Sequence, residues 1–151
     1  MALPADVVKT LDGTNLESRS SEAIRLITVG KDGWPHAAQL SVGEVLAVSP
    51  TELLVATWPN SHTTQNLRRD GRLTLAVVAN GAVLEMCGHA MFETEHQTKR
   101  DLAVFRVKIQ SVHEHRATYA DVTSGVTFRL HDREHTLARW RDQVETLRKL
   151  A

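Results

Sequence analysis

The segment 56–67, Ala-Thr-Trp-Pro-Asn-Ser-His-Thr-Thr-Gln-Asn-Leu, has the residue types and spacing best suited to ligand chemistry. An apolar strand is predicted over 53–57. Beyond Pro59, a hydroxyl-rich stretch with Ser61, Thr63 and Thr64 has the pattern of a helix start. The first N–H groups of a helix have no internal partner and carry partial positive charge. This arrangement predicts an anion site, and phosphate is the ligand that suits it best.

The same residues have a purely structural interpretation. Serine and threonine begin many helices, so Ser61, Thr63 and Thr64 can serve only to cap this one. Asn66 either contacts the ligand or supports only the loop. Composition and local spacing leave both pairs of alternatives open.

The bulk composition predicts one globular domain over residues 1–151. The chain is 42% hydrophobic and 24% charged, and its 18 basic residues balance 18 acidic ones. This balance gives no general attraction to nucleic acid, and no membrane partner is expected. The single cysteine, Cys87, excludes an intramolecular disulfide and suits a reducing compartment. Without a signal-peptide pattern or a membrane-length apolar run, the expected location is cytoplasmic.

Alternating apolar residues and turn signals predict a mainly β (α+β) protein. Helices are expected over 4–11 and 61–69, and at the C-terminus over 132–150, where one apolar stripe contains Leu137, Trp140, Val144 and Leu147. Six strands are expected, over 24–29, 35–43 (extended past a bend by 45–48), 53–57, 73–78, 83–93 and 104–112. Most connections are too short for parallel crossovers, so the prediction is a six-stranded antiparallel barrel with short flanking helices.

Two further segments have weaker signals. The polar stretch 95–101 is predicted to interrupt the strands, and Val126, Phe128 and Leu130 alternate as in a short extra strand. The pairs His113/His115 and His131/His135 lack a third ligand at a known spacing, so no metal site is predicted.

The order of these elements resembles the pyridoxamine 5'-phosphate oxidase-like family of FMN-binding split barrels. The features that carry the resemblance are the phosphate-site helix after the third strand and the later Asn80-Gly81 hairpin. It covers roughly 24–112, and 119–130 also resembles some short members. The resemblance implies a homodimer of split barrels in which each FMN lies in a groove between the subunits.

The family's flavin contacts come from the second strand, the end of the third strand and the start of the following helix. Carried over to this sequence, they give the candidate cofactor-binding residues His36, Gln39, Ser41, Thr57, Trp58, Ser61, His62, Thr63, Thr64 and Asn66. Gln39 and Ser41 either line the flavin ring or belong to a solvated sheet face. Trp58 is expected in packing or a dimer contact, and His36 and His62 are expected to act through their position.

This chain departs from the family pattern at the phosphate. Members often have Ser-Arg-Lys or Ser-x-Lys where this chain has Ser61-His62-Thr63, and Arg where it has His36 or Pro35. Backbone N–H groups and hydroxyls can bind phosphate without a formal charge, and Arg68 and Arg69 can add charge nearby. Otherwise the affinity for FMN is low, or the ligand is a related ring such as a deazaflavin.

The C-terminus bears on the substrate. The authentic oxidase ends in an Arg-Leu pair preceded by a Trp, whereas this chain ends in 148–151, Arg-Lys-Leu-Ala, so vitamin B6 phosphates are not the expected substrate. The leading hypothesis is an FMN-dependent oxidoreductase acting on a small organic molecule, without an identifiable catalytic residue. The alternatives are a flavin carrier or sensor without turnover, and an interaction module whose site has decayed.

Overall fold

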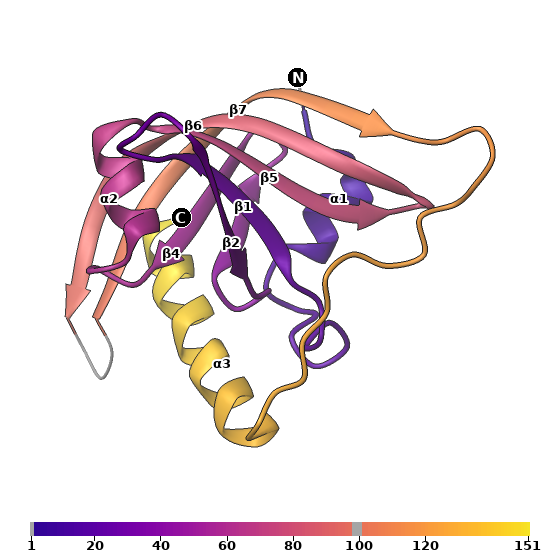
Figure 1. Ribbon diagram of the computed structural model, residues 1–151. Helices are drawn as coiled ribbons and strands as arrows, with labels where there is room; N and C mark the ends of the chain where they lie inside the picture. Colours follow the sequence, from indigo (N-terminus) through magenta and orange to yellow (C-terminus); the bar gives the residue numbers. More distant parts are fainter. Residues whose placement is uncertain (1, 98–100) are drawn as a thin grey trace.

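The computed structural model describes residues 2–97 and 101–151 and consists mainly of antiparallel strands (Figure 1). The helices are α1 (Ala5–Thr10), α2 (His62–Arg69) and α3 (Arg133–Leu150). The strands are β1 (Ile24–Val29), β2 (Pro35–Leu40), β3 (Val45–Ser49), β4 (Glu52–Thr57), β5 (Arg72–Ala79), β6 (Ala82–Gln97) and β7 (Asp101–His115). The predicted helices at both ends and in the middle of the chain are confirmed.

The strands form one curved antiparallel sheet in the order β2-β1-β5-β6-β7-β4-β3. The prediction of six strands was wrong by one, because 45–48 does not continue the second strand. Ser41 and Glu44 form a turn in which the Glu44 N–H bonds Ser41 O at 3.1 Å and Glu44 Oε1 accepts the Ser41 hydroxyl at 2.7 Å. The chain then crosses to the far edge, where Val45 pairs with Val55.

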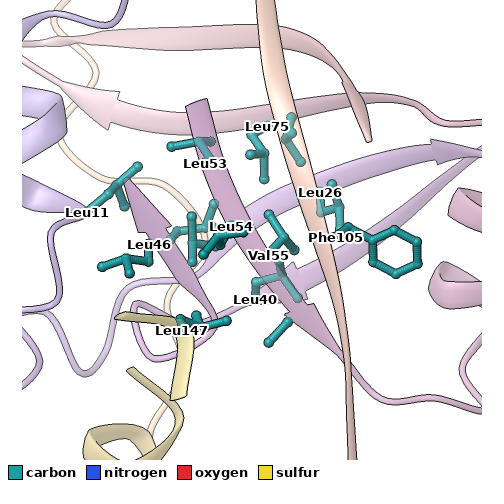
Figure 2. Packing of buried hydrophobic residues seen from close by; sticks show 14 of the residues in the cluster. Leu11, Leu26, Leu40, Leu46, Leu53, Leu54, Val55, Leu75, Phe105 and Leu147 are labelled. Atoms are coloured by element: carbon teal, nitrogen blue, oxygen red, sulfur yellow. The ribbon is translucent and has the colours of Figure 1, made fainter. Parts of the chain in front are cut away.

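The core lies inside the curved sheet and consists mainly of branched aliphatic side chains, with Phe105 among them (Figure 2) and Trp140 contributed by α3. Leu26 from β1, Val55 from β4 and Phe105 from β7 are all fully buried. Their strands are distant in sequence, and burying such side chains contributes about 1.5–3 kcal/mol each. The core therefore holds the ends of β1 and β4 in place, and these two strands support α2.

Helix α3 packs against β3 and β4 (Figure 1). The predicted apolar stripe is confirmed, since Leu137, Trp140, Val144 and Leu147 are all buried. Gly43 makes the close approach of Trp140 possible: a Cβ added to this glycine would lie 2.2 Å from Trp140 Cγ. Among the helices of the described residues, none has the length and apolar character needed to cross a membrane.

The polar break predicted over 95–101 is wrong for its first residues, because β6 extends to Gln97; residues 98–100 lie outside the described ranges. The ladder between β6 and β7 has register shifts at Cys87/Gly88 and Phe92/Thr94. The even-numbered residues from Ala82 to Ala90 nevertheless stay buried across the first shift. Phe92 pairs with the buried Phe105, and the centroids of the two rings are 5.8 Å apart, so Phe92 faces the core side of the sheet although it is 45% exposed.

Residues 122–128, here called the strap, cross the outside of the sheet between β7 and α3 (Figure 1). The predicted extra strand here is reduced to one isolated bridge, Glu22↔Thr127. Backbone bonds fix the strap at two places: Val122 N donates to Gly81 O at 2.8 Å, and Ala23 N donates to Val126 O at 3.0 Å. The strap is thus tied to both the β5–β6 hairpin and the start of β1.

Candidate phosphate site at the start of helix α2

The end of β4 and the first turn of α2 form the corner that the sequence singles out. Ser61 is the N-cap of α2, as predicted, and its hydroxyl oxygen accepts the Thr64 backbone N–H at 3.1 Å. The Ser61 N–H bonds Trp58 O at 3.1 Å and closes the turn after the strand. This capping fixes the direction in which the first N–H groups of the helix point.

The hydroxyl groups of Ser61 and Thr64 are already used inside this turn. Thr64 Oγ1 donates to Trp58 O at 2.6 Å and lies 2.5 Å from Thr57 Oγ1. Ser61 Oγ donates to the same carbonyl oxygen at 2.9 Å. Each hydroxyl has one proton to donate. These side chains therefore hold the turn together and have little capacity left for a ligand.

Three donors at the start of α2 remain available. Within the residues that the structure describes, the backbone N–H groups of His62 and Thr63 have no partner, and neither does the Thr63 hydroxyl. Thr63 is largely buried, with 7% of its surface exposed. Two main-chain groups at the positive end of the helix dipole and one hydroxyl make a donor set suited to an oxyanion.

Two imidazoles lie next to these donors. The ring centroids of His36 on β2 and His62 on α2 are 6.2 Å apart, with the ring planes tilted by 44°. Both histidines are exposed, and Trp58 beside them is 65% exposed. The corner is therefore open to solvent and bounded by aromatic rings. The two imidazoles occupy the region where family members often have Arg or Lys.

Asn66 has a structural role, because both the nitrogen and the oxygen of its side-chain amide have partners inside the protein. Its Nδ2 donates to Thr28 Oγ1 at 3.0 Å, and its Oδ1 accepts from Arg69 at 2.7 Å. Arg69 also donates to Val29 O at 3.3 Å, so its guanidinium is directed to β1. Arg68 lies 4.0 Å from the centre of the Phe92 ring and turns toward β6. Neither arginine is engaged with the first turn of α2.

Gln39 and Ser41 lie away from this corner. Gln39 is exposed and pairs in register with Arg25 on β1, so both face the outside of the sheet. Ser41 is buried in the β2–β3 turn, where its hydroxyl donates to Glu44. The structure thus gathers His36, Thr57, Trp58, His62 and the start of α2 at one corner, and separates Gln39 and Ser41 from them.

Two further polar residues have no motif in the sequence to mark them. The guanidinium of Arg25 on β1 has no hydrogen bond or ion pair within the described ranges. Glu44 accepts from both the N–H and the hydroxyl of Ser41, at 3.0 and 2.7 Å. Burial raises the pKa of the Glu44 carboxyl above its usual range; the bonds from Ser41 and the charge of Arg139 offset only part of that rise. Strand register is the signal that would have pointed to Arg25.

Comparisons with known proteins identify the family of this chain. The model of the pyridoxamine 5'-phosphate oxidase family matches residues 15–134, which is more than half of the chain. The uncharacterized protein YclD of Bacillus subtilis (strain 168) is 39% identical over 142 residues, covering 92% of this chain and 91% of YclD.

Solved structures agree at the level of the fold. HupZ of Group A Streptococcus superposes with a TM-score of 0.59 at 13% identity, over 80% of this chain and 99% of HupZ. An FMN-binding protein of Syntrophomonas wolfei gives a TM-score of 0.50 at 14% identity, over 72% of this chain and 88% of its own. The fold is thus the split barrel of this class. The chain belongs to the pyridoxamine 5'-phosphate oxidase family.

Proposed function

We propose that this protein binds FMN, with the phosphate at the first turn of α2, and uses the flavin in an oxidoreductase reaction on a small organic molecule. The observation that carries the proposal is the set of three free donors, the His62 and Thr63 N–H groups and the Thr63 hydroxyl, beside the paired imidazoles. Family membership and the FMN-binding protein of Syntrophomonas wolfei support the choice of flavin.

The residues present fit a phosphate without the Arg and Lys common in the family. Hydrogen bonds to a charged acceptor contribute roughly 1.5–3 kcal/mol each, so three donors can hold the group. His36 and His62 would flank it, and each can donate one ring N–H. Flavin, when bound, supplies the electron-transfer chemistry. The protein's part is to orient the cofactor and to leave an opening for the substrate.

A fluorescence titration with FMN and with riboflavin tests the phosphate site directly. Wild-type protein should bind FMN more tightly than riboflavin, because riboflavin lacks the phosphate. Thr63→Ala removes the one hydroxyl in the first turn of α2 that has no partner among the described residues, and it should weaken FMN binding about tenfold while leaving riboflavin binding unchanged. Thr63→Ser should restore most of the affinity.

Thr136→Ala is the matched control, because Thr136 lies in the first turn of α3. It should leave both titrations unchanged. A protein that binds neither FMN nor a deazaflavin would contradict the proposal and favour the interaction module with a decayed site. One observation supports that alternative: the Ser61 and Thr64 hydroxyls already donate to Trp58 O.

Turnover separates an enzyme from a flavin carrier. Reduction of the bound flavin by nicotinamide cofactors, followed by stopped flow, should be faster than reduction of free FMN under the enzyme hypothesis. Equal rates would favour the carrier. A deazaflavin titrated in parallel shows which ring system the protein prefers.

We further propose that the functional unit is a homodimer. Several large apolar side chains are exposed on the chain, among them Trp34, Trp58, Met91 and Tyr119, at 72%, 65%, 61% and 91%. Exposed apolar side chains mark a contact surface where they lie together in one patch, and the family resemblance implies a dimer that would cover such a patch. Sedimentation velocity should give a mass twice that of the chain, and a monomer at all concentrations would refute the dimer.

A further inference from the structure

A groove of about 1120 Å³ lies on the outside of the sheet, and its lining residues include none from α2. Its floor comes from the outward-facing residues of β1 and β5, including Ile27, Ala76 and Val78. The segment that follows α1 forms one wall, and the strap lies across the opposite side. Ligand sites in proteins commonly measure roughly 300–1,000 Å³, so this groove is large enough for a small organic molecule.

The strap makes this groove a built feature rather than a gap between loops. It is bonded to Gly81 at one end and to Ala23 at the other. A second bond near the start of β1 runs from Phe128 N to Ser21 O at 2.9 Å. In its middle, a Cβ added to Gly125 would lie 3.2 Å from Val78 Cγ2, so the strap rests against the apolar floor.

The charges that line the groove are unequally matched. Arg19 donates to both carboxylate oxygens of Glu22, at 3.0 and 3.1 Å, and Asp6 accepts from Asn80 at 2.8 Å. Arg25 has no such partner among the residues that the structure describes. Lys9 also lines the groove without an ion pair among the described residues, and Asp6 is bonded only to the neutral amide of Asn80. Arg25 is the unpaired guanidinium of the groove, and it lies on the same sheet face as the apolar floor.

The surroundings of Arg25 favour an anion there. Its cross-strand neighbours are Gln39 on β2 and Ala76 on β5, which are both uncharged. Glu85, one strand further along the same row, is bonded to His115 Nε2 at 2.9 Å and is engaged elsewhere. A planar guanidinium binds a carboxylate, sulfonate or phosphate through two parallel hydrogen bonds.

We propose that this groove binds an organic anion: an apolar body lies on Ile27 and Ala76 beside the strap, and the anionic group is held by Arg25. Gln39, the cross-strand neighbour of Arg25, is one of the residues predicted to line the flavin ring. The bound anion would be the substrate that the flavin oxidises or reduces, and this assignment rests on the proposed function. The binding of an anion in the groove does not depend on that function.

Two fluorescent probes of nearly the same shape test this proposal. Anilinonaphthalene sulfonate carries an anionic group, and phenylnaphthylamine has the same ring system without it. Wild-type protein should bind both. Arg25→Gln should weaken binding of the sulfonate about tenfold and leave the neutral probe unchanged. Arg25→Lys keeps the charge but loses the planar fork, so it should fall between the two.

Lys149→Gln is the control, since it removes the same charge from an exposed position on α3 outside the groove. Ala76→Leu narrows the floor and should weaken both probes. Equal sulfonate binding by the Arg25→Gln and Lys149→Gln variants would overturn the proposal. So would wild-type protein that binds neither probe, as expected if a second copy of the chain fills the groove.

The two proposals fail separately. Arg25-dependent binding of anilinonaphthalene sulfonate by protein that does not bind FMN supports the anion groove and refutes the flavin assignment. FMN binding with a sulfonate affinity indifferent to Arg25 refutes the groove alone.

Discussion

The side-chain amide of Asn66 donates to the hydroxyl of Thr28 at 3.0 Å, and this buried bond joins α2 to β1. Helix α2 has a strongly polar sequence, and this bond connects it to the core of the barrel. The first turn of α2 can present its N–H groups in a fixed direction only if the helix itself is held. The anion site therefore depends on a contact one helical turn beyond its donors.

Replacing Asn66 with Leu should destabilise the protein by about 1–3 kcal/mol, because the Thr28 hydroxyl then loses its buried partner. The same variant should weaken FMN binding, since the start of α2 is less firmly held. Urea unfolding and the FMN titration measure the two effects. Gln65→Leu, at the exposed neighbouring position, is the control, and an equal loss in both variants would show that the Asn66–Thr28 bond contributes nothing.

Replacing Gly43 with Ala should destabilise the packing of α3 by roughly 1–3 kcal/mol, because the new Cβ overlaps the Trp140 ring. Trp140→Leu creates space at the same place. The double variant should therefore lose less than the sum of the two single changes. A thermodynamic cycle from urea unfolding measures this coupling, and strict additivity would show that Gly43 does not serve the approach of the helix.

Arg106 should be irreplaceable by Lys. It bonds Glu52, bonds Glu93 at 3.1 and 3.2 Å, and donates to Leu150 O at 2.5 Å, so it connects β4 and β6 to the end of α3. The two carboxylates raise the pKa of Arg106 still further above its usual range. Lys cannot make this set of bonds, so Arg106→Lys should cost about 1.5–3 kcal/mol.

Arg72→Lys is the control for Arg106, because Arg72 bonds Asp70 on the surface and its side chain is 71% exposed. Exposed ion pairs contribute about 0–1 kcal/mol. Hydrogen exchange should show faster exchange of the last turn of α3 in the Arg106 variant alone. Similar exchange in both variants would rule out Arg106 as the anchor of that helix.

Glu44 should make stability depend on pH in a defined direction. Its pKa is raised in the folded protein, chiefly by burial, so the folded state holds the proton more tightly than the unfolded state. The free energy of unfolding then falls as pH rises from the ordinary carboxyl range through the raised pKa. Glu44→Gln cannot ionise and should flatten this part of the curve.

Urea unfolding at a series of pH values between about 4 and 8 measures how the free energy of unfolding changes with pH. This interval spans the ordinary carboxyl range and the neutral range. Glu134→Gln, an exposed change in the first turn of α3, should leave the slope as in the wild type. A Glu44 variant with the wild-type slope would assign the pH dependence to other groups.

Local features of the fold could be predicted from residues close in sequence. The Asn80-Gly81 pair forms the expected hairpin turn, with positive φ angles of 53° and 77°. The Ser61 cap of α2 follows from side-chain and backbone groups three residues apart. The stripe on α3 follows from helical periodicity, because residues three or four apart share one face.

The strand count and the surroundings of the candidate site could not be predicted in this way. The turn at Ser41 and Glu44 directs β3 to the far edge of the sheet, which depends on pairing with β4 rather than on local propensity. Phe92 pairs with the buried Phe105 but is itself 45% exposed, which the alternation of β6 does not reveal. Both outcomes are decided by partners that lie far away in the chain.

The sequence by itself determined that a capped helix start follows an apolar strand, because capping and turn formation involve neighbouring residues. Only the tertiary structure decided that the Asn66 amide is used by Thr28, that His36 reaches His62, and that Arg25 faces a groove beside the strap. The physical reason is that hydrogen-bond capacity and charge neutralisation depend on which distant side chains the barrel brings together.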